Sequence, residues 1–260
     1  MKEKCKYIIL SYCLAALLAG CAQNPANTTA SGPADTFAGS AGSRVDAGDT
    51  ASINPGSVIV TSGGTMSFST GETSELVDSY YEEATNAMRL GNRVAATVNG
   101  VPVYARMVER SLAMLDYSIE TNIKSIDPEE QLAYRKQYEK TDRQITELFV
   151  RAEAELQEAR RLQLQIDTSA IDQETQKTLE AMQGNYYYEM DRKALGMTEA
   201  EYRDMYIQGN RDEAMRQQLQ IYFIQSLPYA VKTAEDREKA QKDYDAYVDA
   251  LVAKADVKYY

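Results

Sequence analysis

The stretch Arg93–Tyr104, RVAATVNGVPVY, decides the fold that we expect for this chain. Within it, Val94–Val98 has the period-two alternation of a short strand. The dipeptide Asn99-Gly100 provides the left-handed backbone that a tight turn requires. A proline within Val101–Val103 favours extended geometry in the residue before it, so a second extended segment follows the turn. The sequence therefore predicts a small strand unit in a chain that is otherwise rich in helical patterns.

From residue 75 onward, most of the chain has the three- and four-residue spacing of apolar side chains that is typical of helices. We expect helices over 75–90, 105–123, 127–165, 169–183, 198–225 and 233–254, with a further short helix that Gly196 closes. The last residues, Asp256–Tyr260, are again strand-like, and we expect them to pair with Val94–Val98. The predicted fold class is mainly α, with a small β-sheet that joins the N-terminal strand to the C-terminal tail.

Polar residues mark the starts of several of these helices. Asp127 is a capping residue and a proline follows it at the first helical position. The segment Thr198–Glu201 has the spacing of a capping box, and we expect Ser169 and Asp172 to cap the helix that follows residue 168. Acidic clusters at these starts match helix caps better than the alternating oxygen ligands of a calcium loop, so we predict no metal site.

The composition argues against several classes of function. A net charge of -11, from 28 Lys and Arg against 39 Asp and Glu, disfavours binding to nucleic acid or to anionic lipid. The chain has no histidine, so Ser-His or Cys-His catalysis and histidine metal sites are not expected. No glycine-rich phosphate loop is present. We therefore predict neither a cofactor nor catalytic residues.

All three cysteines, Cys5, Cys13 and Cys21, lie near the start of the chain. Met1–Gly20 has a basic start, an apolar centre and a small-residue end, which is typical of a secretion signal and too short to span a membrane. Leu18–Cys21, LAGC, resembles the lipobox of bacterial lipoproteins, in which the cysteine after the cleavage site carries a diacylglycerol. The alternative is an ordinary signal peptide with a chance cysteine. We predict lipid attachment at Cys21, and a mature charge of -13, because residues 1–20 carry three lysines and one glutamate.

The chain divides into three predicted parts. Residues 1–20 are the lipoprotein signal peptide, and 21–74 form a flexible tether rich in Ser, Thr, Gly and Ala. A tether of about fifty such residues has a root-mean-square span of about 40 Å, enough to lift a domain clear of a membrane surface. Residues 75–260 form the helical domain.

Several segments of that domain match a known family in the same order. They are VAATVNGVPV at 94–103, Gln157-Glu158-Ala159, the cap region Thr168–Asp172, GMTEAEYR at 196–203 and the ending KADVKYY. This arrangement resembles the N-terminal domain of SurA/PrsA-type extracytoplasmic chaperones, whose first strand reads roughly V-A-x-V-N-G-x-x-I. The resemblance covers about 93–260, and it implies a SurA N-terminal-like chaperone domain.

The chain departs from that family pattern in two ways. The segment Ser125–Lys140 looks like an insertion that lengthens the second helix, and Leu164-Gln165 stands where a glycine often ends it. Only Leu227–Ala234 separates the last two helices, which is too short for the parvulin prolyl isomerase domain that many family members carry there. The resemblance therefore implies a foldase-like chaperone without the catalytic domain.

The run Tyr186-Tyr187-Tyr188 is the candidate client-binding site. Three successive residues cannot share one helix face, so at least one ring should be exposed or should meet a partner. The 19 tyrosines and 10 methionines of the chain suit an adaptable binding surface, although plain core packing is the favoured explanation for any single one.

Together these features predict a lipoprotein anchored at the extracytoplasmic side of a bacterial membrane. We expect it to bind unfolded or secreted polypeptides as a chaperone, without catalysis. One alternative is a structural or adaptor lipoprotein that docks a single specific partner. A second is a foldase of the peptidyl-prolyl isomerase family.

Overall fold

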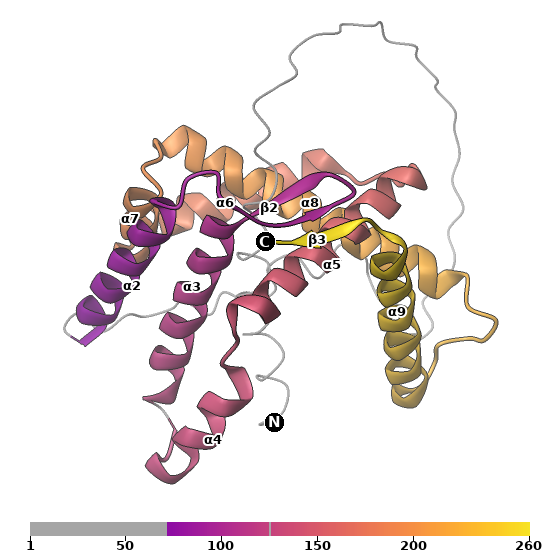
Figure 1. The fold of residues 1–260 in the computed structure, drawn as a ribbon, viewed down its shortest axis with the longest axis horizontal. Helices are drawn as coiled ribbons and strands as arrows, with labels where there is room; N and C mark the ends of the chain where they lie inside the picture. Colours follow the sequence, from indigo (N-terminus) through magenta and orange to yellow (C-terminus); the bar gives the residue numbers. More distant parts are fainter. Residues whose placement is uncertain (1–71, 125) are drawn as a thin grey trace, which may run out of the picture. The chain divides into compact units, whose positions relative to one another are not determined.

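The computed structural model describes residues 72–124 and 126–260, with side chains from residue 75 onward. In order, the elements are α2 (Glu72–Met88), β1 (Val94–Val98), β2 (Val101–Tyr104), α3 (Ala105–Ile123), α4 (Pro128–Tyr138), α5 (Asp142–Arg161), α6 (Thr168–Met182), α7 (Tyr186–Ala194), α8 (Glu199–Gln225), α9 (Ala234–Lys254) and β3 (Val257–Tyr259) (Figure 1). The described part is mainly helical with a small antiparallel sheet, which confirms the predicted fold class at this level. The predicted signal peptide, Cys21 and residues 21–71 of the predicted tether lie outside the described residues.

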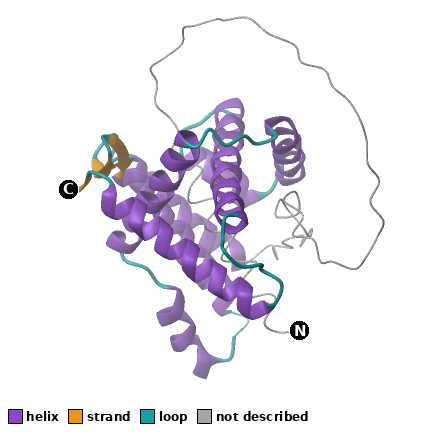
Figure 2. Ribbon diagram, turned by 90° about the vertical axis from the view of Figure 1, so that its right-hand side faces the viewer, coloured by secondary structure: helices purple, strands orange, loops and turns teal. Residues whose placement is uncertain are grey.

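The sheet joins the two ends of the helical domain. β1 is its middle strand and pairs antiparallel with β2 and β3, in the order β2-β1-β3. Val98 lies opposite Val257, and the backbone N–H of Asn99 donates to the carbonyl of Asp256 at 2.9 Å. Figure 2 shows the strands of this sheet, in orange, gathered beside the C-terminus. The predicted pairing of the first strand with the tail is confirmed.

One side chain of α5 ties this sheet to the helices. The Nε2 atom of Gln157 donates to the carbonyl of Val98 at 3.0 Å, and its Oε1 accepts from the Nδ2 of Asn99 at 2.7 Å. The Oδ1 of Asn99 in turn accepts from the backbone N–H of Asp256 at 2.8 Å. We call these four residues, Val98, Asn99, Gln157 and Asp256, the clasp. Through the clasp, α5, the hairpin turn and the start of β3 share one hydrogen-bond chain.

Buried apolar side chains form four clusters. The first joins β1, β2, α3 and α5, the second α2, α3 and α7, the third α6, α7 and α8, and the fourth α5, α8 and α9. Deeply buried members are Val98, Ile145 and Phe149 in the first, Tyr80 and Ala84 in the second, Tyr202 in the third, and Leu219 and Val248 in the fourth. Each cluster shares a helix with the next, and the fourth shares α5 with the first. No cluster can therefore separate without exposing the apolar face of a helix that another cluster needs.

The single helix predicted over 127–165 is wrong, because the chain forms two helices there. Thr141 begins a new helix through a capping box: its side chain accepts from the N–H of Gln144, whose Oε1 accepts from the N–H of Thr141 at 2.9 Å. No residue of α4 is fully buried; Tyr134 and Tyr138 pack against the first cluster while only partly buried, so α4 contributes little to the core. α5 also ends earlier than predicted, since Gln163 has a φ of 55° and leaves the helical conformation.

The predicted caps of α6 are also wrong. Asp167 caps this helix, since its Oδ1 accepts from the N–H of Ala170 at 3.1 Å. Ser169 therefore lies inside the first turn, and Asp172 forms an ion pair with Arg211 of α8 instead. Asp172 was a plausible cap because Asp at a helix start usually has that role. Its actual partner comes from a segment far away in the sequence.

We expect deletion of 256–260 to lower the melting temperature of the domain by about 5–10 °C. The deletion removes the backbone hydrogen bonds between β1 and β3, each of which contributes about 1 kcal/mol net to stability. The measurement is thermal unfolding followed by circular dichroism. Tyr260→Ala is the matched control, because that side chain is 76 % exposed and its backbone is retained. An unchanged melting temperature in the deletion variant would show that β3 does not close the domain.

Candidate functional site

An ion pair is completely buried among α2, α3, α7 and α8. Arg110 is 1 % exposed and Asp191 is 0 % exposed, and the guanidinium Nη2 lies 2.8 Å from Oδ2 of the carboxylate. The Nε and Nη2 atoms of Arg110 also donate to Oδ1 of Asp191, at 3.2 and 3.1 Å. The hydroxyl of Tyr80 donates to Oδ1, and that of Tyr202 donates to Oδ2 at 2.5 Å. Both oxygens of the Asp191 carboxylate therefore accept hydrogen bonds, each from Arg110 and from one tyrosine.

The electrostatics of this pair fit a structural role. Burial alone would lower the pKa of Arg110, but the negative charge of Asp191, the neighbouring Tyr80 and Tyr206, and the hydrogen bonds to Asp191 together outweigh it and hold that pKa well above its ordinary value. Burial, reinforced by the charge of Asp191, raises the pKa of Tyr80 well above its ordinary value. The guanidinium of Arg110 therefore stays charged and the phenol of Tyr80 stays neutral. Because solvent cannot reach these groups, the pair positions helices and does not meet a substrate.

The three predicted client-binding tyrosines have three different environments in α7. Tyr188 is 2 % exposed and packs edge-on against Tyr202, with 5.0 Å between ring centroids. Tyr187 is half-buried and lies 5.1 Å from the ring of Tyr80. Tyr186 is exposed, and its hydroxyl donates to Asp78 of α2 at 2.6 Å. The run does expose one ring, as its spacing predicted, but it does not form a continuous aromatic surface. Client contact at Tyr186 stays a prediction.

A groove lies between the carboxyl-terminal ends of α5, α8 and α9. Its volume is about 560 Å³ and its lining residues are Glu158, Arg161, Leu162, Tyr222, Phe223, Ser226, Tyr247, Leu251 and Lys254. The ring of Phe223 stacks on that of Tyr247, with centroids 4.8 Å apart. Tyr222 is 46 % exposed, while Phe223 and Leu251 are half-buried. The lining thus presents aromatic and aliphatic side chains that the fold leaves partly uncovered.

Charged side chains of both signs surround this groove. Arg161 donates to Glu158 from Nε at 2.6 Å and from Nη2 at 2.8 Å, and the hydroxyl of Tyr247 donates to the same carboxylate at 2.7 Å. These hydrogen bonds, that of Arg161 above all, lower the pKa of Glu158. Three helices end here, and their carboxyl termini carry a partial negative charge that favours cations. The groove can accordingly hold an apolar segment that carries charged residues beside it.

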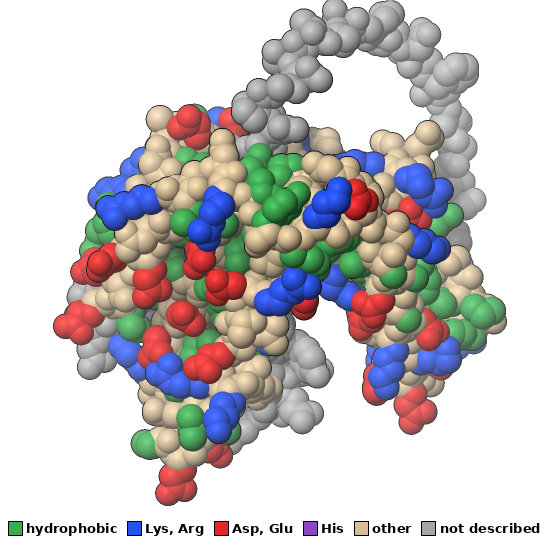
Figure 3. All heavy atoms as spheres, in the orientation of Figure 1, with side chains coloured by type: hydrophobic (Ala, Val, Ile, Leu, Met, Phe, Trp, Pro, Cys, Tyr) green, Lys and Arg blue, Asp and Glu red, His purple; other side chains and the backbone are tan. Residues whose placement is uncertain are grey.

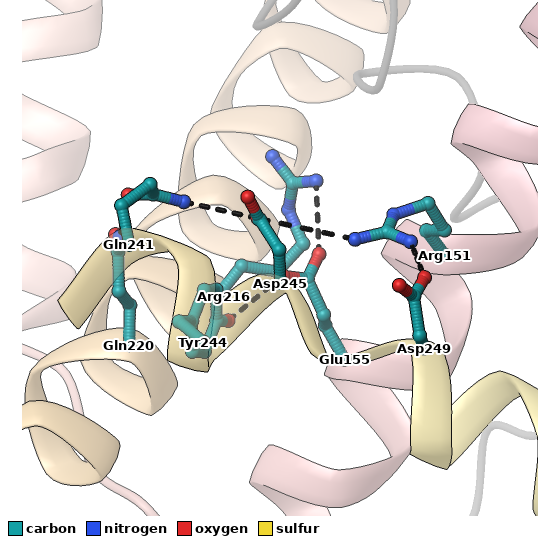
Figure 4. A network of polar contacts seen from close by, with 8 residues as sticks. All are labelled: Arg151, Glu155, Arg216, Gln220, Gln241, Tyr244, Asp245 and Asp249. Carbon is teal, nitrogen blue, oxygen red and sulfur yellow. Dashed lines mark hydrogen bonds and ion pairs between the residues drawn. The ribbon is translucent and has the colours of Figure 1, made fainter. Parts of the chain in front are cut away.

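A polar network holds the three helices of the groove together. Figure 4 shows Arg216 of α8 directed at Glu155 of α5, whose Oε1 accepts from the hydroxyl of Tyr244 of α9 at 2.7 Å. Arg151 of α5 forms an ion pair with Asp249 of α9 in the same view. Arg216 and Glu155 are each largely buried, so breaking their contact leaves a charge without its partner. The network fixes the spacing of α5, α8 and α9.

Two further carboxylates are buried at the interface of α5 and α8. Glu153 accepts from Nε2 of Gln157 at 2.9 Å, and Asp212 accepts from Nε2 of Gln208 at 3.0 Å. Burial raises the pKa of both groups, and the charge of Asp212 raises that of Glu153 further. Arg160 and Arg216 only partly offset this for Asp212. Both groups favour the protonated form more in the folded chain than in the unfolded chain.

Within residues 72–124 and 126–260, no group of three or more His, Cys, Asp and Glu side chains is arranged to bind a metal ion. In the same residues, no helix combines the length and the apolar character that crossing a membrane requires. Comparisons with known proteins give no match: neither a protein-family model, nor a curated protein, nor a solved structure is significantly similar to this chain.

Sequence reasoning missed the buried ion pair and the groove. Arg110 occupies a position between Met107 and Met114 on an apolar face of α3, and Asp191 occupies a similar position between Tyr188 and Leu195. Opposite charges on two apolar stripes could have indicated a buried pair. No comparable signal marks the groove, because its aromatic residues follow the same spacing as core residues.

We expect Arg110→Met to destabilise the domain by about 3–5 kcal/mol, because it leaves the carboxylate of Asp191 buried without its cation. The double variant Arg110→Met, Asp191→Asn should cost less than the sum of the two single variants, since it removes both charges. Chemical denaturation of the four proteins measures these differences. Lys242→Met, in an exposed ion pair with Glu238, is the control and should change stability little. Additive single-variant effects would contradict the coupling.

We expect Asp212→Asn to gain stability relative to the unsubstituted chain as the pH rises from 4 to 7. A carboxylic acid whose pKa is raised by folding stabilises the folded state below its unfolded pKa, and this contribution is lost as the pH rises through the folded pKa. Asparagine does not titrate, so the variant does not lose this contribution to stability. Asp172→Asn should show the opposite trend in a lower window: the hydrogen bond from Arg211 lowers the pKa of Asp172 below its ordinary value, so the unsubstituted chain loses this contribution as the pH falls below about 4, and the variant does not. Thermal unfolding from pH 2 to 7 tests both variants, and curves parallel to that of the unsubstituted chain would contradict the assignment.

Proposed function

We propose that this chain is a lipid-anchored, extracytoplasmic chaperone that binds unfolded or secreted polypeptides without catalysis. Its client-binding site is the groove between the ends of α5, α8 and α9. The observation that carries the proposal is the partly uncovered set of Tyr222, Phe223, Tyr247 and Leu251 beside charges of both signs. An unfolded polypeptide presents apolar and charged side chains together, and such a groove is complementary to both.

The apolar floor of the groove can receive varied side chains. Aromatic rings bury a large area with few rotatable bonds, so they bind at low entropic cost and without strict sequence demands. The network of Arg151, Glu155 and Arg216 keeps the three helices apart at a fixed spacing, which keeps the groove open in the absence of a client. The groove is therefore a binding site that is already formed before the client binds.

The lipid anchor predicted at Cys21 places this groove outside the membrane. Two acyl chains on one cysteine hold a protein at a bilayer stably, whereas a single chain gives only marginal binding. The mature net charge of -13 and the charged side chains interspersed over the face in Figure 3 favour solubility of the chain with a client bound. The SurA/PrsA-type resemblance of the sequence is consistent with this proposal.

One observation favours the adaptor alternative. The large hydrophobic side chains that are exposed within the described residues are few and scattered, namely Val101, Leu132, Tyr186, Tyr222, Tyr259 and Tyr260. A chaperone for many clients usually offers a larger apolar surface. A single groove also suits one specific partner, and the two functions differ in whether binding is selective.

We expect Tyr222→Ser to weaken binding of a chemically unfolded client by about 5- to 30-fold, because an exposed aromatic anchor commonly contributes 1–2 kcal/mol to binding. The mature chain carrying Cys21→Ser is used, and light scattering measures the delay of client aggregation. The same Cys21 substitution should move the chain from the membrane fraction to the soluble fraction. Leu132→Ser is the matched control, since that side chain is 61 % exposed on α4 and distant in sequence from the groove.

Three outcomes separate the hypotheses. If the chain does not delay aggregation and binds no unfolded peptide, the chaperone proposal is wrong. Equal losses in Tyr222→Ser and Leu132→Ser would contradict the assignment of the site to the groove. Stoichiometric binding of one folded protein, without binding of unfolded clients, would favour the adaptor function.

A further inference from the structure

The turn between β1 and β2 contains the single Asn-Gly step of the sequence, Asn99-Gly100. Asn99 has a φ of 51° and Gly100 a φ of 85°, as the tight turn requires, and both residues are exposed. Asn99 also belongs to the clasp, where its side chain connects α5 to the start of β3. A chemically labile dipeptide thus lies at the point where the C-terminal strand is attached.

We infer that Asn99 is a site of spontaneous deamidation, that the clasp restrains the reaction, and that its product releases the C-terminal strand. In the reaction, the deprotonated backbone nitrogen of Gly100 attacks Cγ of Asn99 and forms a new C–N bond. The bond from Cγ to Nδ2 breaks, and ammonia leaves with the proton. Water then opens the resulting succinimide at either carbonyl, which gives aspartate or isoaspartate.

Gly100 makes the attack sterically easy. Glycine has no Cβ to obstruct the approach of its nitrogen to the side chain before it, and it leaves the backbone free to rotate into the geometry of attack. The surroundings of Gly100 are also open, since a Cβ built there would meet nothing within 4 Å. Access of water and freedom of the backbone are therefore both available at this turn.

The clasp restrains the side chain that must react. The Nδ2 of Asn99 donates to Gln157 at 2.7 Å, and its Oδ1 accepts from the N–H of Asp256 at 2.8 Å. Both partners hold the carboxamide toward α5 and β3. Attack by Gly100 requires the carboxamide to leave these partners, so the docked tail slows the reaction.

The product no longer fits the clasp. A carboxylate at position 99 presents an acceptor to Oε1 of Gln157, where the native amide presents a donor. Gln157 cannot turn its amide without loss, because its Nε2 already donates to Val98 and Glu153. The new negative charge also shares the amide of Gln157 as a neighbour with the buried carboxylate of Glu153, which accepts from Nε2 of that amide. Deamidation therefore weakens the attachment of β3 and, since it is irreversible, makes the release permanent.

The test follows the amide of Asn99 in the full-length chain during incubation at mildly alkaline pH. Peptide mapping by mass spectrometry measures the exchange of NH2 for OH at this position. Deletion of 256–260 and Gln157→Met each remove one hydrogen bond to the carboxamide. We expect each change to speed the reaction about 5-fold, and both together about 30-fold. Asn86, exposed in α2, is the internal control and should react at the same rate in all variants.

The second arm of the test follows release of the tail by carboxypeptidase digestion. Asn99→Asp, which reproduces one product, should lose its C-terminal residues faster than the unsubstituted chain from the start. Asn99→Gly keeps the turn but cannot deamidate, so its digestion rate should not change with the time of incubation.

Three results would overturn the inference. If Asn99 keeps its amide in every variant, it is not a deamidation site. Equal rates with and without the clasp residues, or an equal acceleration at Asn86, would show that the clasp does not restrain the reaction. Unchanged digestion of the tail in Asn99→Asp would show that the product does not release β3.

Discussion

The pairing of β1 with β3 is the constraint on which the rest of the structure depends. It joins residues that are about 160 positions apart in the sequence, yet the entropic cost of closing a loop grows only slowly with its length. Once β3 is attached, the end of α9 is held beside α5, because only the short segment Ala255-Asp256 separates α9 from β3. The groove exists because α5, α8 and α9 all end at this place.

The clasp and the buried ion pair hold different parts of the domain together. The clasp attaches α5 to the hairpin: the amide of Gln157 donates to the carbonyl of Val98 and accepts from the side chain of Asn99. The pair of Arg110 and Asp191 acts between the second and third apolar clusters, where α7 contributes to both. A buried pair of this kind adds little net stability over an apolar pair, but it permits few alternative arrangements of the helices.

The sequence was sufficient for local features and for the strand pairing between the two ends of the domain, and insufficient for the side-chain contacts between distant helices. The hairpin could be predicted, since Asn99-Gly100 and the alternation before it act within a few residues, and the tail could be paired with it because both were strand-like. The capping box of α8 was likewise visible in Thr198 and Glu201. The break between α4 and α5 was not recognised, although Thr141 and Gln144 have the spacing of a capping box. The single helix predicted from the Asp127 cap runs past this second start, since the apolar spacing of α5 follows in the same sequence.

The candidate site was harder to predict for a physical reason. Tyr186, Tyr187 and Tyr188 differ in exposure because α2, α3 and α8 pack around α7, and this packing cannot be seen in a run of three identical residues. The groove residues, by contrast, have the helical spacing of buried residues and yet lie partly exposed. Phe223 and Tyr247 follow the spacing of core residues, but α5, α8 and α9 end before they can cover them.

The measurement that tests the closure of the domain most directly is native-state hydrogen exchange at the backbone amides of Asn99 and Phe149. Asn99 donates to Asp256 across the β1–β3 pair, while Phe149 lies in the buried first cluster of α5. If β3 is an integral part of the fold, both amides exchange only by global unfolding and give the same free energy of opening. Rapid exchange at Asn99 beside strong protection at Phe149 would contradict this account, since the tail would then open without the rest of the domain.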